Sequence, residues 1–378
     1  METTSLYRKY RPQTFGEVVG QEHVVKTLCS ALANNMIGHA YLFAGPRGTG
    51  KTTIARLVAK ALNCQKIKNG EFQTRTSTVW GEPCAACDAC IAFINEQTID
   101  VIEVDGASTR GIDEIRELKE HVRFGPSMGR YKVFIIDEVH MLTKEAFNAL
   151  LKTLEEPPPQ VVFILATTEI TKVPQTIISR TQRFDFRPLR IKDISEQVKK
   201  IANLEKIKLS DSALLQIAHS ANGSLRDALS VLEQLASFSD NDVSDGDVTA
   251  LLGIPELERL NKILFSIASG DTKNALVLIN STYEEGYDMA TVIKGLIDLL
   301  RKLIFIEVGG EASLIDLAEK EEEIMHSLLK VIDSSQAKEM LLRFVQALSS
   351  MRYSAVASLP LELAILDLTD KGTMKQEV

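Results

Sequence analysis

Residues 45–52 read Gly45-Pro46-Arg47-Gly48-Thr49-Gly50-Lys51-Thr52, which has the form G-x-x-x-x-G-K-[ST]. An apolar run precedes this stretch at residues 40–44, and a helical pattern follows it at residues 53–62. The glycines allow backbone N–H groups to surround a polyphosphate, and the N-terminus of the helix adds the positive end of its dipole. The alternative is a Gly-rich turn without a ligand, which the strand–loop–helix context disfavours. The stretch therefore predicts that the chain binds a nucleoside triphosphate.

Two side chains of this loop have specific predicted roles. Lys51 is expected to reach the β and γ phosphates, and Thr52 is expected to hold Mg²⁺ through its hydroxyl. The rest of the expected phosphate-binding surface consists of Gly45, Pro46, Arg47, Gly48, Thr49, Gly50 and Thr53.

The composition is that of an ordinary globular protein. Of the 378 residues, 45% are hydrophobic and 25% are charged, and this length predicts about two or three domains. No apolar run has membrane-spanning length, and the polar, basic N-terminus does not have the form of a signal peptide. We therefore expect a cytoplasmic protein with no membrane partner. The net charge of −8 argues against a protein coated in nucleic acid, but it leaves room for a local basic surface.

Cysteines form a candidate metal site. Cys84, Cys87 and Cys90 have the spacing C-x-x-C-x-x-C, and Cys64 lies upstream of them. Disulfides are rare in cytosolic proteins, whereas four thiolates suit tetrahedral Zn²⁺. An iron–sulfur cluster would take the same ligands, and small buried cysteines are the alternative without a metal. We expect a structural zinc site, because four cysteines leave no open position for a substrate, and we expect Cys29 in the core.

The first half of the chain alternates strand and helix patterns. Buried strands are expected at residues 132–136 and 161–166, and a strand of alternating apolar residues at 101–105, with helices at residues 112–122 and 143–156. This alternation predicts a doubly wound parallel sheet with helices on both faces.

Helical periods dominate after Pro188, and the polar stretch at residues 239–246 is interpreted as a linker. The expected domains are a nucleotide-binding domain at residues 1–187 with the cysteine module at about 64–90, a small helical domain at 188–240, a second all-α domain at 245–368 and a flexible tail at 369–378.

An acidic pair follows the strand expected at residues 132–136. Asp137 and Glu138 would stand at the carboxyl end of a parallel strand, facing the crevice where ligands bind in such sheets. Asp137 can hold Mg²⁺, and Glu138 can polarise the water that attacks the γ-phosphate. The alternative is an acidic N-cap of the next helix. An intact Glu138 favours hydrolysis over binding alone.

Three further residues are candidates for catalysis. Thr168 follows the strand expected at residues 161–166 and could hydrogen-bond the γ-phosphate or the water, although a strand-end threonine without this role is equally compatible. Arg180 and Arg226 could stabilise charge on the transferring phosphoryl group. Taken singly, each arginine is more often a surface ion-pair partner.

The order of these motifs resembles the AAA+ clamp-loader ATPases, and among them the gamma/tau family of bacterial DNA polymerase III. The resemblance runs in register over the first 240 residues or so and continues more loosely to about residue 368. It rests on Tyr7-Arg8-Lys9-Tyr10-Arg11-Pro12, Phe15, Val18-Val19-Gly20-Gln21, residues 45–52, the cysteine module, Asp137-Glu138-Val139-His140-Met141-Leu142, residues 147–158, Ala166-Thr167-Thr168-Glu169, Ser179-Arg180 and residues 223–229. It implies an α/β P-loop NTPase domain of the AAA+ type with a zinc-binding insertion, a helical lid and a C-terminal all-α collar.

The resemblance also implies a role for individual residues. Thr168 matches a sensor of the γ-phosphate, and Arg226 matches a second sensor on the lid that reaches the nucleotide of its own subunit. Arg180 matches an arginine finger that reaches the ATP of a neighbouring subunit. The segment that packs around the adenosine is matched, less securely, by Arg11, Pro12, Val18 and Val19.

The sequence departs from the family at two places. Thr181 stands where the family usually has cysteine after the finger arginine, and residues 66–80 form a longer stretch than usual before the cysteine triplet. We expect the finger to work with altered local packing, and the shape of the cysteine loop to differ.

By this resemblance the chain would be an ATPase subunit of the DNA polymerase III holoenzyme that opens the sliding clamp and loads it onto primed DNA. Its expected partners are the delta and delta prime subunits, copies of itself, the sliding clamp and primer–template DNA, with ATP, Mg²⁺ and Zn²⁺ as cofactors. Arg110 is a candidate DNA contact, and a solvated loop arginine is an equally good interpretation.

Two other classes of protein remain open at this point. A helicase-type AAA+ motor acting on branched DNA would explain the phosphate loop but not the four cysteines or the collar. A non-hydrolysing structural subunit of the loader typically lacks a working phosphate loop, whereas Gly50, Lys51, Thr52 and Glu138 are intact here.

Overall fold

The computed structural model describes residues 5–68, 81–95, 97–109, 111–253, 255–309 and 319–370. The chain divides into two compact units, Met1–Val243 and Ser244–Val378. Among the described residues, we find no helix with both the length and the apolar character needed to cross a bilayer.

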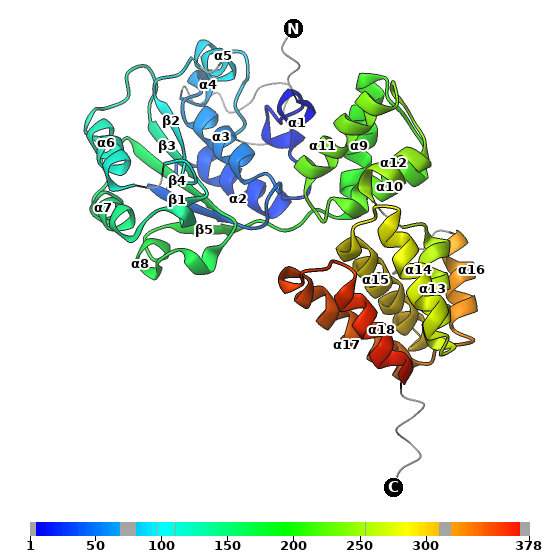
Figure 1. Ribbon diagram of the computed structural model, residues 1–378. Helices are drawn as coiled ribbons and strands as arrows, with labels where there is room; N and C mark the ends of the chain where they lie inside the picture. The colour runs from blue at the N-terminus through cyan, green and yellow to red at the C-terminus, as the bar shows by residue number, and fades with distance from the viewer. Residues whose placement is uncertain are drawn as a thin grey trace. The chain divides into compact units, whose positions relative to one another are not determined.

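A five-stranded sheet forms the centre of the first unit, with the strand order β2-β3-β4-β1-β5 and parallel pairing throughout (Figure 1). The strands are β1 (Ala40–Ala44), β2 (Val101–Asp105), β3 (Lys132–Asp137), β4 (Val161–Thr167) and β5 (Gln182–Asp185). The three central strands β1, β3 and β4 are buried almost end to end, as continuous apolar runs predict for a parallel sheet covered on both faces.

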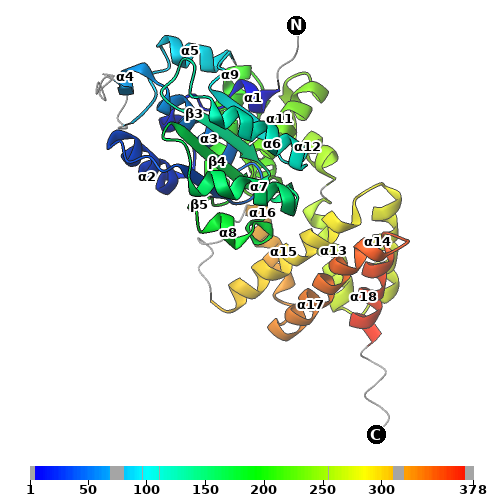
Figure 2. The same cartoon turned by 90° about the vertical axis from the view of Figure 1, so that its left-hand side faces the viewer.

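Helices cover both faces of this sheet, which confirms the predicted doubly wound α/β class (Figure 2). Alternate strand residues face opposite ways. One face packs Phe43 and Ile135 against α2 (Glu22–Ala33) and α3 (Lys51–Leu62), and the other packs Leu42 and Phe134 against α6 and α7. The other elements of this part of the chain are α1 (Leu6–Lys9), η1 (Phe15–Glu17), α4 (Gln65–Lys68), α5 (Asp88–Ile94), α6 (Ile112–Arg123), η2 (Val139–Met141), α7 (Lys144–Glu155), η3 (Ile170–Lys172) and α8 (Gln175–Ile178).

Three helices complete the first unit after the sheet: α9 (Ile191–Glu205), α10 (Asp211–Ser220) and α11 (Leu225–Phe238). The short N-terminal helix α1 packs against α11. Ser210 and Ser224 cap α10 and α11 by accepting hydrogen bonds from backbone N–H groups of the first turn.

One sequence prediction of this region is wrong in part. The stretch at 239–246 is not simply a linker, because β7 (Asp242–Val243) pairs with β6 (Lys208–Leu209) and α12 begins at Asp245. The reciprocal hydrogen bonds of Ser244 and Asp247 form a capping box that starts this helix. The strand β5 was also missed, because only Phe184 of its residues is buried.

The described helices of the second unit pack around one core, as predicted for an all-α domain. Its elements are α12 (Asp245–Leu252), α13 (Leu257–Ala268), α14 (Thr272–Glu284), α15 (Met289–Glu307), α16 (Glu319–Leu328), α17 (Ser334–Ser350), η5 (Met351–Tyr353) and α18 (Leu359–Thr369). Buried side chains of α15 and α17, including Leu296 and Phe344, form the centre of this core. The tail predicted at 369–378 lies outside the described residues from residue 371 onward, and Thr369 belongs to α18.

Truncation of Leu296 should destabilise the second unit strongly. This side chain is fully buried in α15, so Leu296→Ala leaves a cavity and should lower the free energy of unfolding by about 2–5 kcal/mol. Leu342→Ala is the matched control, because Leu342 lies on α17 and is 59% exposed. Chemical denaturation followed by circular dichroism measures both values, and equal losses would contradict the assigned core.

Candidate nucleotide-binding site and cysteine cluster

The phosphate loop lies between β1 and α3, at the carboxyl edge of the sheet. Gly50 adopts a left-handed backbone conformation (φ 99°) directly before Lys51, the first residue of α3. Gly48 is also left-handed (φ 74°), and a Cβ added there would lie 1.8 Å from the Ser224 hydroxyl oxygen. The loop therefore needs glycine at position 48 to pack against the start of α11.

Lys51 is held inside this loop. Its ammonium group donates hydrogen bonds to the carbonyl oxygens of Gly45 (2.8 Å) and Pro46 (2.7 Å), which leaves a third N–H for another acceptor. Burial lowers the pKa of Lys51, while the carboxylates of Glu138 and Asp137 oppose this shift. The acidic pair thus helps to keep the buried ammonium charged.

The acidic pair lies at the end of β3, beside the loop, as its position in the sequence predicted. Asp137 accepts a hydrogen bond from the Thr52 hydroxyl at 2.7 Å through one oxygen and from the Glu138 N–H at 2.9 Å through the other. A hydroxyl and a carboxylate are oxygen ligands of the kind that Mg²⁺ takes in nucleotide sites, so this pair fits the predicted metal.

Glu138 is fixed by the strand next to its own. Thr168, directly after β4, donates to its Oε2 from the hydroxyl (2.9 Å) and the backbone N–H (3.3 Å). His140 Nδ1 lies 3.3 Å from the same oxygen. Glu138 also has a left-handed backbone (φ 45°), a conformation that non-glycine residues rarely adopt. Thr168 thus contacts Glu138, a role that the sequence did not indicate.

A cavity of about 390 Å³ opens in front of the loop and the acidic pair. Of the predicted site residues, the structure brings together around it Arg11, Pro12, Val18, Val19, Arg47, Gly48, Thr49, Gly50, Lys51, Thr52, Thr53, Asp137, Glu138 and Arg226. The carbonyl oxygens of Gly45 and Pro46 accept hydrogen bonds from Lys51, and the Thr168 hydroxyl donates one to Glu138. Residues predicted from separate motifs therefore line or adjoin one cavity.

Arg226 reaches this cavity from the first turn of α11. Its guanidinium lies over the Tyr7 ring, 4.5 Å from the ring centre, and it approaches the Tyr7 hydroxyl at 3.4 Å. A cation over an aromatic face is attracted by the ring quadrupole. Tyr7, which the sequence analysis gave no role at the site, therefore orients Arg226.

Gln21 is a second residue at this site that sequence reasoning missed. It is fully buried, and its side chain exchanges hydrogen bonds with the backbone N–H (3.2 Å) and carbonyl (2.7 Å) of Arg187. It also donates to the carbonyl of Thr49 at 3.3 Å. One amide thus ties the phosphate loop to the segment between β5 and α9.

Arg180 lies apart from the cavity, two residues after the end of α8. Its guanidinium pairs with the Glu155 carboxylate and donates to the carbonyl of Thr176 at 2.9 Å. The hydroxyl of Thr181, at the unusual position, donates to the carbonyl of Ile178 at 3.1 Å. Arg110 and residues 69–80 lie outside the described residues.

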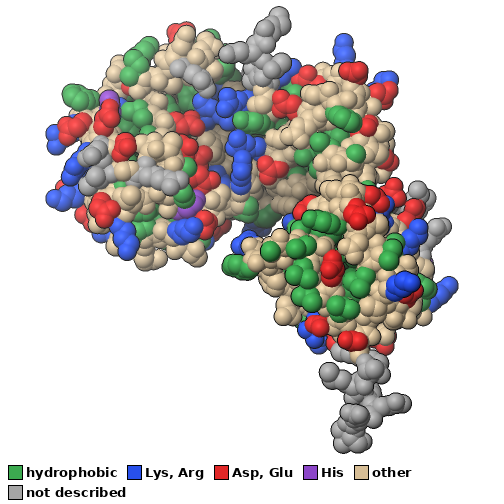
Figure 3. Space-filling model, viewed as in Figure 1, with side chains coloured by type: hydrophobic (Ala, Val, Ile, Leu, Met, Phe, Trp, Pro, Cys, Tyr) green, Lys and Arg blue, Asp and Glu red, His purple; other side chains and the backbone are tan. Residues whose placement is uncertain are grey.

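Cationic side chains gather near α1 and α3 in the space-filling view (Figure 3). A second cavity of about 630 Å³ in this part of the chain is lined by Arg8, Arg11, Arg56 and Lys60, among others. A local basic surface therefore exists despite the negative net charge of the chain.

The four predicted cysteines form a compact cluster. The Sγ atoms of Cys64, Cys84, Cys87 and Cys90 all lie within 4.8 Å of one another. Backbone N–H groups of Cys84 and Cys87 point at the sulfurs of Cys64 (3.4 Å) and Cys84 (3.3 Å), as around metal-bound thiolates. Tetrahedral Zn²⁺ with bonds of about 2.3 Å requires sulfurs about 3.8 Å apart, so the cluster fits this metal.

The thiols of the cluster differ in acidity. A hydrogen bond from Cys90 lowers the pKa of Cys64, and the same contact raises the pKa of Cys90. The cluster therefore favours a thiolate, which is the form that binds metals. Cys29, by contrast, is buried in the core as predicted, and burial raises its pKa to about 12.

Models of protein families match nearly the whole chain. A model of the DNA polymerase III delta subunit matches residues 20–190, and a model of the ATPase lid domain of DNA polymerase III clamp loader subunits matches residues 193–241. A model of domain III of DNA polymerase III subunits gamma and tau matches residues 243–377.

Curated relatives agree with these models. The chain is 39% identical over 368 residues to DNA polymerase III subunit tau of Bacillus subtilis, covering 97% of this chain and 63% of that protein. It is 33% identical over 371 residues to DNA polymerase III subunit gamma of Buchnera aphidicola, covering 97% of each. The chain thus spans less than two thirds of the Bacillus subtilis relative and nearly all of the Buchnera aphidicola one.

A solved structure of the RuvB Holliday junction branch migration motor of Thermotoga maritima is a more distant match. It is 21% identical, has a TM-score of 0.47, and covers 68% of this chain and 79% of that one.

The packing of Gly48 against the lid helix can be tested by adding one methyl group. Gly48→Ala and Gly50→Ala both force alanine into a left-handed conformation, which costs about 1 kcal/mol or more. Only the methyl group at position 48 meets Ser224, whereas nothing lies within 4 Å of one at position 50. Gly48→Ala should therefore lower the free energy of unfolding by about 1–3 kcal/mol more than Gly50→Ala, measured by urea denaturation. Equal losses would contradict the close contact.

Proposed function

This chain belongs to the family of DNA polymerase III gamma and tau subunits, and we propose that it is an ATP-hydrolysing subunit of a bacterial clamp loader. In this role it opens the sliding clamp and loads it onto primed DNA as part of the DNA polymerase III holoenzyme. The observation that carries the proposal is the convergence of Lys51, Asp137, Glu138 and Arg226 on one cavity in front of the phosphate loop.

ATP binding is assigned to the loop and its surroundings. The third N–H of Lys51 would meet the β and γ phosphates, and backbone N–H groups at the start of α3 would surround them. Arg11, Pro12, Val18 and Val19 would pack around the adenosine. Thr52 and Asp137 would hold Mg²⁺, which when bound neutralises charge on the phosphates.

Hydrolysis is assigned to Glu138 as the residue that orients and polarises the attacking water. The hydrogen bonds from Thr168 fix the position of its carboxylate, and Arg226 supplies positive charge from the lid side of the same cavity. Because both donors of Thr168 point at Glu138, a γ-phosphate that draws Thr168 away would also change where Glu138 lies. Thr168 would in this way report the nucleotide.

Arg180 is assigned to the site of a neighbouring subunit. It is absent from the cavity of its own chain and lies at the surface beside α8, where it pairs with Glu155. Following the family resemblance, its proposed partner is the ATP of the next subunit, where its positive charge would stabilise phosphoryl transfer. Hydrolysis would then depend on assembly with copies of the chain and with the delta and delta prime subunits.

The remaining parts of the chain are assigned to structure and assembly. Cys64, Cys84, Cys87 and Cys90 would bind one structural Zn²⁺. Residues 188–240 would act as the lid, and residues 245–368 would form the collar that holds the subunits together. Primer–template DNA would be held through its phosphates by local basic surfaces, which the acidic net charge permits.

Two substitutions separate nucleotide binding from hydrolysis. Lys51→Ala should abolish binding of ATP and Mg²⁺, because it removes the buried cation. Glu138→Gln should keep the affinity for ATP within about threefold and reduce turnover on the order of a hundredfold or more, because it removes the base but keeps the acceptor of Thr168. Binding of a fluorescent ATP analogue and phosphate release, with clamp and primed DNA present, measure the two effects. Full turnover by Glu138→Gln would refute the assigned base.

The trans role of Arg180 has a matched control. Arg180→Ala should bind ATP normally and lose clamp-stimulated hydrolysis on the order of a hundredfold. Arg183→Ala, at a nearby exposed arginine that pairs with Asp185, should hydrolyse ATP at the normal rate. The measurement is steady-state phosphate release by the reconstituted loader. Mixing Arg180→Ala with Lys51→Ala subunits tests whether the arginine acts across the interface. Unchanged turnover by Arg180→Ala alone would refute the assignment.

A further inference from the structure

The segment at residues 11–19 lies between the nucleotide cavity and the cysteine cluster. Arg11, Pro12, Val18 and Val19 line the cavity. Between them, Gln13 accepts a hydrogen bond from Lys60, and Gly16 donates one to Glu82, which stands two positions before Cys84. The proposed adenosine contacts and the cysteine module therefore share one short piece of chain.

The first of these contacts is a buried charge. Lys60 lies on α3, is 2% exposed, and donates to the backbone carbonyl of Gln13 at 3.1 Å and to its side-chain oxygen at 3.4 Å. Burial lowers the pKa of Lys60, so its ammonium needs acceptors close by. Because an unpaired buried ammonium is expensive, these two acceptors hold Lys60 against Gln13.

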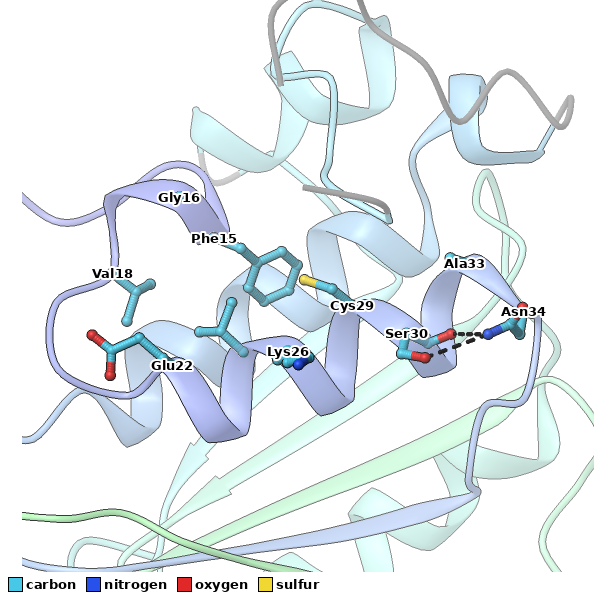
Figure 4. Close-up of a pocket in the computed structure, with 10 residues that line it drawn as sticks. Phe15, Gly16, Val18, Glu22, Lys26, Cys29, Ser30, Ala33 and Asn34 are labelled. Atoms are coloured by element: carbon cyan, nitrogen blue, oxygen red, sulfur yellow. Dashed lines mark hydrogen bonds between the residues drawn. The ribbon is translucent and has the colours of Figure 1, made fainter. Parts of the chain in front are cut away.

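The second contact is a hydrogen bond across the surface of the domain. The backbone N–H of Gly16 donates to Glu82 Oε1 at 2.8 Å. Phe15, which precedes it, is 1% exposed and belongs to the same apolar core as Cys64 and Cys90. Figure 4 shows the Phe15 ring and the Cys29 side chain pointing toward each other above α2. Phe15 anchors the middle of the segment, and Glu82 fixes the backbone next to it.

Helix α3 joins the same two sites. It begins with Lys51 of the phosphate loop and ends at Leu62, two residues before Cys64. A helix of this length spans about 18 Å, so the two sites lie on opposite ends of one rigid rod. The segment at residues 11–19 is the second connection between them, and its one helical turn is the short 3₁₀ helix Phe15–Glu17.

We propose that the metal-loaded cysteine module positions the adenosine-binding segment, with Lys60 and Glu82 as the positioning residues, so that nucleotide affinity depends on an intact module. This inference rests on the proposed function, because it takes the cavity to be the ATP site and the cluster to be the zinc site. It assigns the module a role in nucleotide binding within its own subunit.

The test is a pair of substitutions at one position in the full-length chain. Glu82→Ala removes the acceptor for the Gly16 N–H and should weaken binding of a fluorescent ATP analogue about three- to tenfold, the worth of one hydrogen bond. Glu82→Gln keeps a side-chain oxygen and should restore the wild-type affinity. Asp88→Ala, an exposed carboxylate of the same module, is the control and should bind normally. All variants should retain one zinc per chain by elemental analysis.

Hydrogen exchange gives a readout that does not depend on nucleotide. The amides of residues 11–19 should exchange faster in Glu82→Ala and in wild-type protein treated with a zinc chelator, and at the wild-type rate in Glu82→Gln. The inference would be overturned if Glu82→Ala and wild type had equal affinity for the ATP analogue and equal exchange rates. It would also be overturned if Glu82→Ala and Glu82→Gln lost equal affinity and both lost zinc. If wild type binds no ATP analogue but exchange still responds to Glu82→Ala, the positioning stands and the proposed function fails.

Discussion

The site depends on one geometric constraint: parallel strands end at a common edge of the sheet. Strand β4 lies between β1 and β3 and pairs with both, so the residues that follow these three strands are brought together although they are far apart in the sequence. The phosphate loop follows β1, Asp137 and Glu138 end β3, and Thr168 follows β4. Every contact of the acidic pair with Thr52 and Thr168 is a consequence of this register. A strand order without these neighbours would leave the same motifs unable to act together.

The same constraint explains how much of the site could be predicted from the sequence. The phosphate loop, the acidic pair and the cysteine cluster are local patterns whose spacing indicates their chemistry, and the central strands are continuous apolar runs. These elements were predicted with nearly their observed bounds. The edge strand β5 was not, because it pairs only with β1 and buries a single residue, so its composition resembles that of a loop.

The contacts that were missed are those between residues distant in the sequence. Tyr7 meets Arg226, Glu155 meets Arg180, and Lys60 meets Gln13, and no local pattern relates the members of any pair. Each depends on a fold that brings separate segments together. Gln21 is instructive, because its type and position indicate a surface polar residue. It is fully buried, since the backbone groups of Arg187 satisfy its amide.

The charged side chains of the site interact with one another, and a bound nucleotide would change these interactions. Lys51 is buried beside two carboxylates, which favour its charged form, and those carboxylates in turn accept hydrogen bonds from Thr52 and Thr168. A triphosphate adds several negative charges next to Asp137 and Glu138, and like charges at short distance repel. A divalent cation held by Thr52 and Asp137, together with Arg226, would offset this repulsion on two sides of the phosphates. Glu138 has a left-handed backbone conformation that its neighbours hold in place. Under the proposed function, a redistribution of these contacts would carry nucleotide binding to the proposed water-activating group.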